Sequence, residues 1–286
     1  MQIDYALILS AGLGTRMGEI GRNIPKVMWP ILDRKLIDLQ IDYCRDLGID
    51  KIFINTHYLS EVIEEHIKKN YDNSIVLLHE NPLLDSGGAI HNLAQQKNIN
   101  YKGNLLTVNG DQFLFFEKNY FNKAISMLSE ARAVLFAINA SKEDAYNETV
   151  LSQDKLIDIR KNSGERDFIT FSGLGLIKLD GLKPEIGPTK FFKTVANYEL
   201  ETVKMILPTC LEYWDFGTVS IYYRSISSII EKRAQNLKIH QFLKSHKINL
   251  DNTQKFYQPS ERSIDLEMLG RFTENSLIFK NIKQSI

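Results

Sequence analysis

Tyr5-Ala-Leu-Ile-Leu-Ser10 runs directly into Ala11-Gly-Leu-Gly-Thr-Arg-Met17, and Pro25-Lys26 follows after seven intervening residues. The first segment is a short apolar run, which is typical of a strand buried on both faces. The two glycines of the second segment let the backbone approach a ligand closely, so successive N–H groups can surround phosphate oxygens. Arg16 and Lys26 add positive charge there. These residues predict a phosphate-binding loop after the first strand of a sheet.

This glycine-rich loop does not fit the two most common nucleotide-binding motifs. In a dinucleotide fingerprint the third glycine would fall on Met17, and a Walker loop would need Gly-Lys-Ser/Thr. For the two glycines alone, a surface turn with ordinary cations is the simpler interpretation. The Thr15-Arg16-Met17 sequence and the Pro-Lys pair after a buried strand favour the binding loop.

Strands alternate with helices through residue 109. The expected strands are 5–10, 51–55, 74–79 and 104–109, and the expected helices are 36–47, 60–66 and 88–95. Each helix shows an apolar stripe at helical spacing, and Gly48 is placed to end the first of them. Strands joined in this way by helices predict right-handed crossovers and a largely parallel sheet.

The pattern changes after a further expected strand at 131–140. Two short strands, 148–152 and 155–160, flank Gln153-Asp154 and predict a hairpin inserted over the sheet. The remaining expected elements are a strand at 168–178, a helix at 190–207, a strand at 213–218 and a helix at 221–234. We expect one domain over residues 1–230 and a C-terminal appendage over 231–286. One rung-like stretch at 272–278 cannot bury its own face without neighbours, so helix or irregular structure is expected there.

The composition indicates a globular protein and excludes several classes of partner. Of 286 residues, 43% are apolar and 24% are charged, which excludes disorder and fibres. The 35 Lys and Arg residues balance the 35 Asp and Glu residues, so no net charge favours nucleic acid or an anionic membrane surface. An anionic ligand must therefore be held by local charges.

Cysteine usage and the lack of a long apolar run bear on the compartment. Cys44 and Cys210 lack metal-site spacing, and a single disulfide between them is not expected in a chain without a secretory signal. No apolar run approaches the roughly 18 residues that a membrane span needs. The sequence predicts a cytoplasmic location without membrane insertion.

Four motifs in one order resemble those of the sugar-1-phosphate nucleotidyltransferases. The first is the loop with its downstream Pro-Lys, and the others are Leu84-Asp-Ser-Gly-Gly-Ala-Ile90, Val108-Asn-Gly-Asp111 and Trp214-Asp-Phe-Gly-Thr218. Together they span residues 5 to about 225. The resemblance implies a nucleotidyltransferase (GT-A-like) fold, which is an α/β fold with a Rossmann-like, mostly parallel sheet and helices on both faces.

The resemblance also assigns roles in binding the nucleotide. Lys26 would contact the α-phosphate and Arg16 the β- and γ-phosphates, while Asp111 and Asp215 would hold Mg²⁺ as the cofactor. The nucleotide would contact Ala11, Gly12, Gly14, Thr15, Glu80, Gly87 and Gly88. The amides of the last two glycines would read a base edge. Glu80 would accept from a base N–H group or, as a lone glutamate, would be a solvated loop residue.

The acceptor half matches the family less closely. Many members have Glu-Lys-Pro, whose lysine contacts the sugar phosphate, where this chain has Ile159-Arg160-Lys161-Asn162. We expect Lys161 to substitute, and Asn109, Ser172 and Gly173 to complete the sugar-phosphate site. Two short segments, 55–58 and 170–173, resemble the N-acetylmuramate-1-phosphate uridylyltransferase branch.

The chain has no Ser-His-Asp or Cys-His arrangement, and the expected reaction needs none. A phosphate monoester has a second pKa near ~6, so its oxygen is already an ionised nucleophile at neutral pH. The expected reaction converts an NTP and a sugar 1-phosphate into an NDP-sugar and pyrophosphate, in sugar-nucleotide synthesis for the cell envelope. Uridylyl transfer to N-acetylmuramate 1-phosphate is the first expectation. The alternatives are guanylyl transfer to mannose or heptose 1-phosphate and cytidylyl transfer to a small phosphorylated alcohol.

A non-catalytic nucleotide-sensing subunit is the alternative from another class. Such a subunit would be expected to lose one or more of the phosphate- and metal-binding residues, and this chain keeps Arg16, Lys26, Asp111 and Asp215. The enzyme is therefore favoured. The C-terminal appendage would suit a subunit contact in a homo-oligomer.

Overall fold

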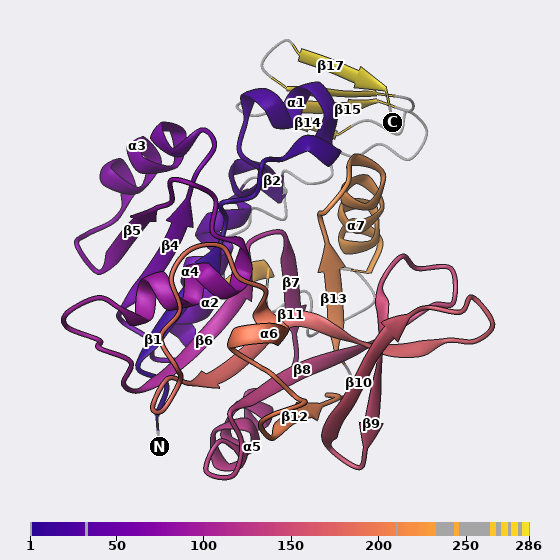
Figure 1. The fold of residues 1–286 in the computed structure, drawn as a ribbon. Helices are drawn as coiled ribbons and strands as arrows, with labels where there is room; N and C mark the ends of the chain where they lie inside the picture. Colours follow the sequence, from indigo (N-terminus) through magenta and orange to yellow (C-terminus); the bar gives the residue numbers. More distant parts are fainter. Residues whose placement is uncertain are drawn as a thin grey trace.

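The computed structural model describes residues 2–31, 34–209, 211–232 and 243–245, and the backbone of four short strands between 264 and 285. A nine-stranded sheet forms the centre, with the strand order β5-β4-β1-β6-β11-β8-β12-β10-β9 (Figure 1). These strands are β1 (Tyr5–Leu9), β4 (Ile52–Thr56), β5 (Ile75–His79), β6 (Asn104–Asn109), β8 (Ala133–Ala140), β9 (Asn147–Ser152), β10 (Lys155–Lys161), β11 (Phe168–Lys178) and β12 (Val203–Ile206).

The first half of the sheet is parallel and the second half is mixed. β5, β4, β1 and β6 run parallel to one another. β11 is antiparallel to both β6 and β8, whereas β12 is parallel to β8. The expected α/β class and the alternation of strands and helices in the N-terminal half are therefore confirmed, and the carboxyl ends of β1, β4 and β6 lie at one edge of the sheet.

Two apolar cores lie on opposite faces of the sheet. Along β1, Ala6 and Ile8 belong to one core and Leu7 to the other, and all three are fully buried. This alternation is why the first strand is apolar at consecutive positions. The helices of the first core are α2 (Leu36–Asp46), α3 (Ser60–Asn70), α5 (Asn119–Met127) and α7 (Val219–Lys232), and those of the second are α4 (Asp85–Ala94) and α6 (Phe191–Thr194).

Short elements connect the first strand to α2. They are the 3-10 turns η1 (Thr15–Met17) and η2 (Lys26–Met28), helix α1 (Gly18–Asn23), and strands β2 (Pro30–Ile31) and β3 (Arg34–Lys35), which pair as a small hairpin. Met17 and Trp29 are fully buried in the first core. Buried apolar side chains thus anchor the segment that follows the glycine-rich loop.

The expected helix at 190–207 is wrong. Only Phe191–Thr194 is helical, and Val203–Ile206 forms β12, which pairs in parallel with β8. Between them, the Asn197 carbonyl oxygen accepts hydrogen bonds from the amides of Leu200 and Glu201, so the chain turns there. The apolar residues of this segment fit a helical period, but pairing with a buried strand decided their conformation.

The expected hairpin is present as β9 and β10, with Gln153 in its turn at φ 56°. It continues the central sheet, because β10 pairs with β12 (Figure 1).

In the C-terminal range, the described segments include β14 (Ile264–Leu266), β15 (Gly270–Thr273), β16 (Ser276–Phe279) and β17 (Ile282–Ser285), which form an antiparallel sheet. This differs from the expected helix or irregular structure, because successive short strands pair through close turns. β17 lies beside α1 (Figure 1). The division into residues 1–230 and 231–286 stays a prediction.

Cys44 is a free thiol in the first core, where burial raises its pKa to about 12. Cys210 lies outside the described residues. Among the helices that the structure describes, none has the length and apolar character needed to cross a membrane.

Candidate active site

The loop after β1 forms one wall of a cavity of about 500 Å³ at the carboxyl edge of the parallel strands. Gly14 has φ 65°, and a Cβ there would lie 2.8 Å from the carbonyl oxygen of Gly21. Glycine is required at this position because any side chain would strain the turn and clash with the backbone. The loop thereby exposes Gly12 and turns Arg16 toward the cavity.

The structure brings to this cavity three of the seven predicted nucleotide-binding residues, three of the predicted phosphate- and metal-binding residues, and Asn109, which was predicted for the sugar phosphate. Its lining includes Ala11, Gly12, Arg16, Lys26, Glu80, Asn109 and Asp111. Gly14 and Thr15 shape the loop without lining the cavity. Ser10 and Pro188 are further lining residues outside the predicted motifs, and Asn55 and Asp85 line the cavity from within two of the stretches that the sequence analysis quoted.

Gly87 and Gly88 differ from expectation. Their amides donate to the carbonyl oxygen of Thr189 at 2.9 and 3.3 Å, so both amides already have a partner within the chain. A Cβ at Gly87 would lie 2.7 Å from that carbonyl oxygen, and one at Gly88 would lie 2.5 Å from the carbonyl oxygen of Gly187. These glycines are therefore required for close packing of α4 against the segment before α6.

Glu80 is 1% exposed, which excludes a solvated loop residue. Its carboxylate accepts hydrogen bonds from Asn55 Nδ2 at 2.8 Å and from the Leu84 amide at 2.9 Å. Asn55 Oδ1 in turn accepts from the Ser10 amide at 2.7 Å. This chain of hydrogen bonds joins the ends of β1, β4 and β5 and holds one side of the cavity.

Asp111 and Asp215 lie together although they are far apart in the sequence. β7 (Gln112–Phe115) and β13 (Glu212–Asp215) form an antiparallel ribbon in which Gln112 is opposite Asp215. Asp111 directly precedes β7, and its carbonyl oxygen accepts a hydrogen bond of 2.9 Å from the Phe216 amide. The ribbon therefore brings Asp215 close to Asp111. Asp111 lines the cavity, whereas Asp215 is buried beside it and does not line it.

Gly217 keeps the space between the two carboxylates open. A Cβ there would lie 2.8 Å from Asp215 Oδ1 and 3.6 Å from Asp111 Oδ2. Lys26 Nζ lies 2.9 Å from Asp111 Oδ2 and 3.5 Å from the Gly217 carbonyl oxygen. The Arg16 guanidinium is 4.0 Å from Asp111 Oδ2 with its side chain largely exposed. The positive charges of Lys26 and Arg16 thus lie beside the Asp111 carboxylate.

Within the described residues, no group of three or more His, Cys, Asp or Glu side chains is arranged to hold a metal ion. Mg²⁺ binds proteins through one or two carboxylates and completes its shell with phosphate oxygens and water. The Asp111 and Asp215 pair, with the open space that Gly217 leaves between them, fits that requirement.

Tyr146, just before β9, is a site residue that the sequence analysis missed. Its hydroxyl donates a hydrogen bond to Asp215 Oδ2, while Asp215 Oδ1 accepts from the Gly217 amide at 2.6 Å. Burial, together with the Asp215 carboxylate, raises the pKa of Tyr146, so its hydroxyl stays protonated as a donor. No motif marks this tyrosine, because only the fold brings it to Asp215.

We expect Tyr146→Phe to weaken divalent-metal binding about 10–100-fold, because hydrogen bonds to a metal ligand fix its orientation. Calorimetric titration with Mn²⁺ in the presence of nucleotide measures this directly. Tyr120→Phe is the matched control, since its hydroxyl bonds Thr209 away from the cavity. Equal Mn²⁺ affinity in wild type and Tyr146→Phe would contradict the role.

A second cavity, of about 560 Å³, adjoins the first and shares Leu9, Ser86 and Asn109 with it. Of the residues predicted for the sugar phosphate, Asn109 and Gly173 line this second cavity. Gly173 has φ +86°, and a Cβ there would clash with the side chains of Asn109 and Gln112. Asn109 Nδ2 donates to Gln112 Oε1 at 2.8 Å, which links the second cavity to the ribbon that carries Asp215.

Two of the predicted sugar-phosphate residues do not line the second cavity. The Ser172 hydroxyl is buried and donates to the Phe136 carbonyl oxygen at 2.7 Å, so it supports the irregular part of β11. Lys161 is exposed at the end of β10, and Ile159 of the same strand lines the cavity instead.

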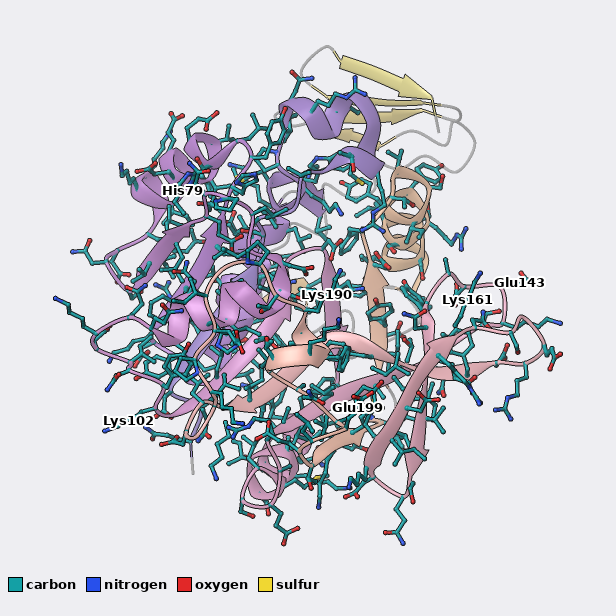
Figure 2. All side chains as sticks on the ribbon, viewed as in Figure 1. His79, Lys102, Glu143, Lys161, Lys190 and Glu199 are labelled. Carbon is teal, nitrogen blue, oxygen red and sulfur yellow. The ribbon has the colours of Figure 1, made fainter. Side chains whose placement is uncertain are left out.

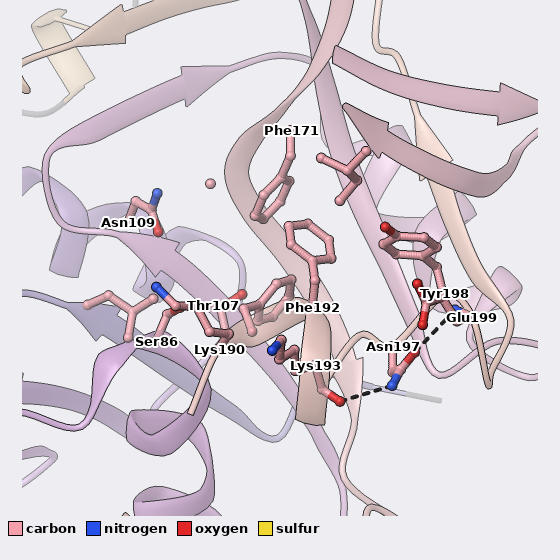
Figure 3. A pocket seen from close by; sticks show the side chains of 14 residues that line it. Ser86, Thr107, Asn109, Phe171, Lys190, Phe192, Lys193, Asn197, Tyr198 and Glu199 are labelled. Carbon is pink, nitrogen blue, oxygen red and sulfur yellow. Dashed lines mark hydrogen bonds between the residues drawn. The ribbon is translucent and has the colours of Figure 1, made fainter. Parts of the chain in front are cut away.

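Sequence reasoning missed most of the second cavity. Its far wall is aromatic and polar, with Phe171, Phe191, Phe192, Asn197, Tyr198 and Glu199 (Figure 3). Phe171 and Phe191 stack with ring centroids 5.7 Å apart. Lys190 and Lys193 are the two cations. The Lys190-Phe-Phe-Lys193 cluster was a readable signal, but it fell in the segment assigned to a long helix.

Comparison with known proteins agrees with this geometry. The family model described as nucleotidyl transferase matches residues 5–158, which is more than half of the chain. The chain therefore belongs to the nucleotidyl transferase family. Its curated relatives place it among the sugar-1-phosphate nucleotidyltransferases, and it is an enzyme of that class.

A D-glycero-alpha-D-manno-heptose 1-phosphate guanylyltransferase of Campylobacter jejuni is 29% identical over 61% of this chain and 76% of its own length. An N-acetylmuramate alpha-1-phosphate uridylyltransferase of Caulobacter vibrioides is 33% identical over 31% of this chain and 39% of its own length. Among solved structures, HddC from Yersinia pseudotuberculosis complexed with GMP-PN is 21% identical and covers 79% of this chain and 99% of its own, with a TM-score of 0.65. This last likeness supports the fold.

Proposed function

We propose that this protein transfers guanylyl groups from GTP to a manno-configured sugar 1-phosphate, with D-glycero-α-D-manno-heptose 1-phosphate as the acceptor. The observation that carries the reaction is the pair of joined cavities with Asp111 at the edge of the first and Asn109 shared between them. One cavity is suited to the nucleotide and the other to the acceptor, so the two phosphates can meet where they join.

The side chains around Asp111 provide the charge that the reaction requires. Lys26 is 15% exposed, so its ammonium acts where water screens it little. It is placed to stabilise charge on the α-phosphoryl oxygens, and the exposed Arg16 is placed for the outer phosphates. Magnesium held by Asp111 and Asp215 would neutralise charge on the reacting phosphates. The acceptor phosphate is its own nucleophile, so no protein base is needed.

The choice of guanine and heptose rests on the Campylobacter jejuni relative, which matches the larger part of this chain. This is the alternative that the sequence analysis placed behind uridylyl transfer. Uridylyl transfer to N-acetylmuramate 1-phosphate is the second candidate, supported by the shorter match to the Caulobacter vibrioides relative.

A pyrophosphate-release assay crossing four NTPs with an acceptor panel tests the proposal. The panel contains the 1-phosphates of heptose, mannose, glucose and N-acetylmuramate, together with choline phosphate. We expect release only when NTP, Mg²⁺ and acceptor are all present, with the highest kcat/KM for GTP and heptose 1-phosphate. If UTP and N-acetylmuramate 1-phosphate exceed that pair, the second candidate is correct. If nucleotide binds but no pair reacts, the protein is a sensing subunit.

A further inference from the structure

The cavity assigned to the acceptor contains two cationic side chains on its lining, Lys190 and Lys193, and both come from the segment around α6. A sugar 1-phosphate carries close to two negative charges at neutral pH, and binding it in a largely apolar cavity requires a cation. The acceptor phosphate must also reach the nucleotide, so its cation should lie near the residues common to both cavities.

The hairpin does not supply this cation. On β10, Ile159 lines the cavity and Arg160 is held by Glu148, with Nε 2.9 Å and Nη2 3.2 Å from its carboxylate oxygens. Lys161 is exposed and does not line the cavity. Lys161, which was expected to make the phosphate contact, therefore does not line the cavity, and its neighbours on β10 are an apolar lining residue and an arginine paired with Glu148.

Lys190 lies at the junction of the two cavities. In Figure 3 its side chain points toward Ser86 and Asn109, two of the residues that line both cavities. Its backbone position is fixed, because the neighbouring Thr189 donates to the Leu84 carbonyl oxygen at 3.0 Å and accepts from the Gly87 amide at 2.9 Å. A lysine on this fixed segment reaches the junction without moving the backbone.

Asp85 holds Lys190 in the free protein. Lys190 Nζ lies 3.2 Å from Asp85 Oδ2, with side-chain exposures of 74% and 41%. Asp85 lines the first cavity and Lys190 the second, so this ion pair crosses from one to the other. An exposed ion pair of this kind is weak, so a phosphate can replace the carboxylate as the partner of the lysine.

We propose that Lys190 binds the acceptor phosphate, in place of a hairpin lysine, and that Asp85 is the partner it leaves when the acceptor enters. The aromatic wall formed by Phe171, Phe192 and Tyr198 then receives the carbon skeleton of the sugar. This inference rests on the proposed function, because it assumes that the second cavity takes a phosphorylated acceptor.

Calorimetric titration with α-D-mannose 1-phosphate, in the presence of Mg²⁺ and a non-hydrolysable GTP analogue, tests the assignment. Lys190→Gln is expected to raise the Kd for mannose 1-phosphate about tenfold or more, because a hydrogen bond to a charged group is lost. The Kd for the GTP analogue should stay within about twofold. Lys183→Gln, which removes an exposed charge from the same segment, should change neither value.

Asp85→Asn adds an independent measurement. Asn tolerates the φ of 60° that Asp85 adopts and removes the charge that restrains Lys190. Mannose 1-phosphate should bind about two- to threefold more tightly to Asp85→Asn than to wild type, and this gain should vanish in the double variant with Lys190→Gln.

The outcomes separate this inference from the proposed function. If wild type turns over but Lys161→Gln weakens mannose 1-phosphate binding and Lys190→Gln does not, the hairpin lysine binds the phosphate and only the inference is wrong. Unchanged affinity in both lysine variants also overturns it. If wild type binds the GTP analogue but no sugar 1-phosphate, the proposed function is wrong and this inference falls with it.

Discussion

Asp111→Asn and Asp215→Asn are each expected to reduce turnover to near the limit of detection. The two carboxylates meet across the β7–β13 ribbon, and Gly217 leaves room for a cation between them. We expect both carboxylates to be needed to hold the Mg²⁺ ion that would face the α-phosphate, because proteins bind Mg²⁺ through one or two carboxylates. The measurement is pyrophosphate release at saturating nucleotide and acceptor, over a range of Mg²⁺ concentrations.

The double variant distinguishes a shared metal from two separate roles. Groups that act as a unit are strongly non-additive, so Asp111→Asn combined with Asp215→Asn should be scarcely worse than either alone. Asp158→Asn, which neutralises an exposed carboxylate on β10, is the control and should keep wild-type turnover. Losses that simply multiply, or Mn²⁺ affinity that is unchanged in either single variant, would refute the shared site.

Lys26→Ala is expected to lower kcat about 10²–10³-fold while changing nucleotide affinity much less. A preorganised donor aimed at charge that develops during the reaction stabilises the transition state more than the ground state. Pro25, directly before η2, fixes the backbone that places the ammonium 2.9 Å from Asp111 Oδ2. Single-turnover rates and direct nucleotide titration measure the two quantities separately.

Lys102→Ala is the matched control for Lys26→Ala, because Lys102 is an exposed lysine far from the cavities (Figure 2). It should leave kcat and nucleotide affinity unchanged. Suppose that Lys26→Ala keeps a near-normal kcat and only raises the KM for nucleotide. The lysine then stabilises the bound ground state and the transition state equally, and its assignment to the α-phosphate is wrong. Thermal unfolding of each variant separates these effects from loss of the fold.

The order of the longer strands and helices through β6 was predictable because it depends on local signals, whereas the short elements between β1 and α2 were not predicted. The apolar run of β1 indicates burial on both faces, and the structure divides Ala6 and Leu7 between the two cores. Gly14 has a positive φ, and the sequence alone indicates a turn there because glycine adopts this conformation without steric cost. Helix and strand periods in this half agree with the tertiary packing, so the expected bounds differ from the observed ones by only a few residues.

Residues whose role depends on partners distant in sequence were predicted poorly. The motif predicts that the backbone amides of Gly87 and Gly88 contact a base. In the structure both amides donate to the carbonyl oxygen of Thr189, which is distant in the sequence. A helix was expected between residues 190 and 207, but Val203–Ile206 pairs with β8, and the sequence does not reveal that pairing. The Lys190–Asp85 ion pair could not be predicted either, because its two residues are far apart in the sequence.

The sequence by itself determined the class of fold and predicted the residues that bind phosphate, because a glycine-rich turn and an apolar period are properties of consecutive residues. Only the tertiary structure decided that Tyr146 contacts Asp215 and that Lys190 and Lys193 line the second cavity. These contacts join segments separated by tens of residues or more. Sheet pairing and close glycine packing fix them, and neither leaves a periodic signal along the chain.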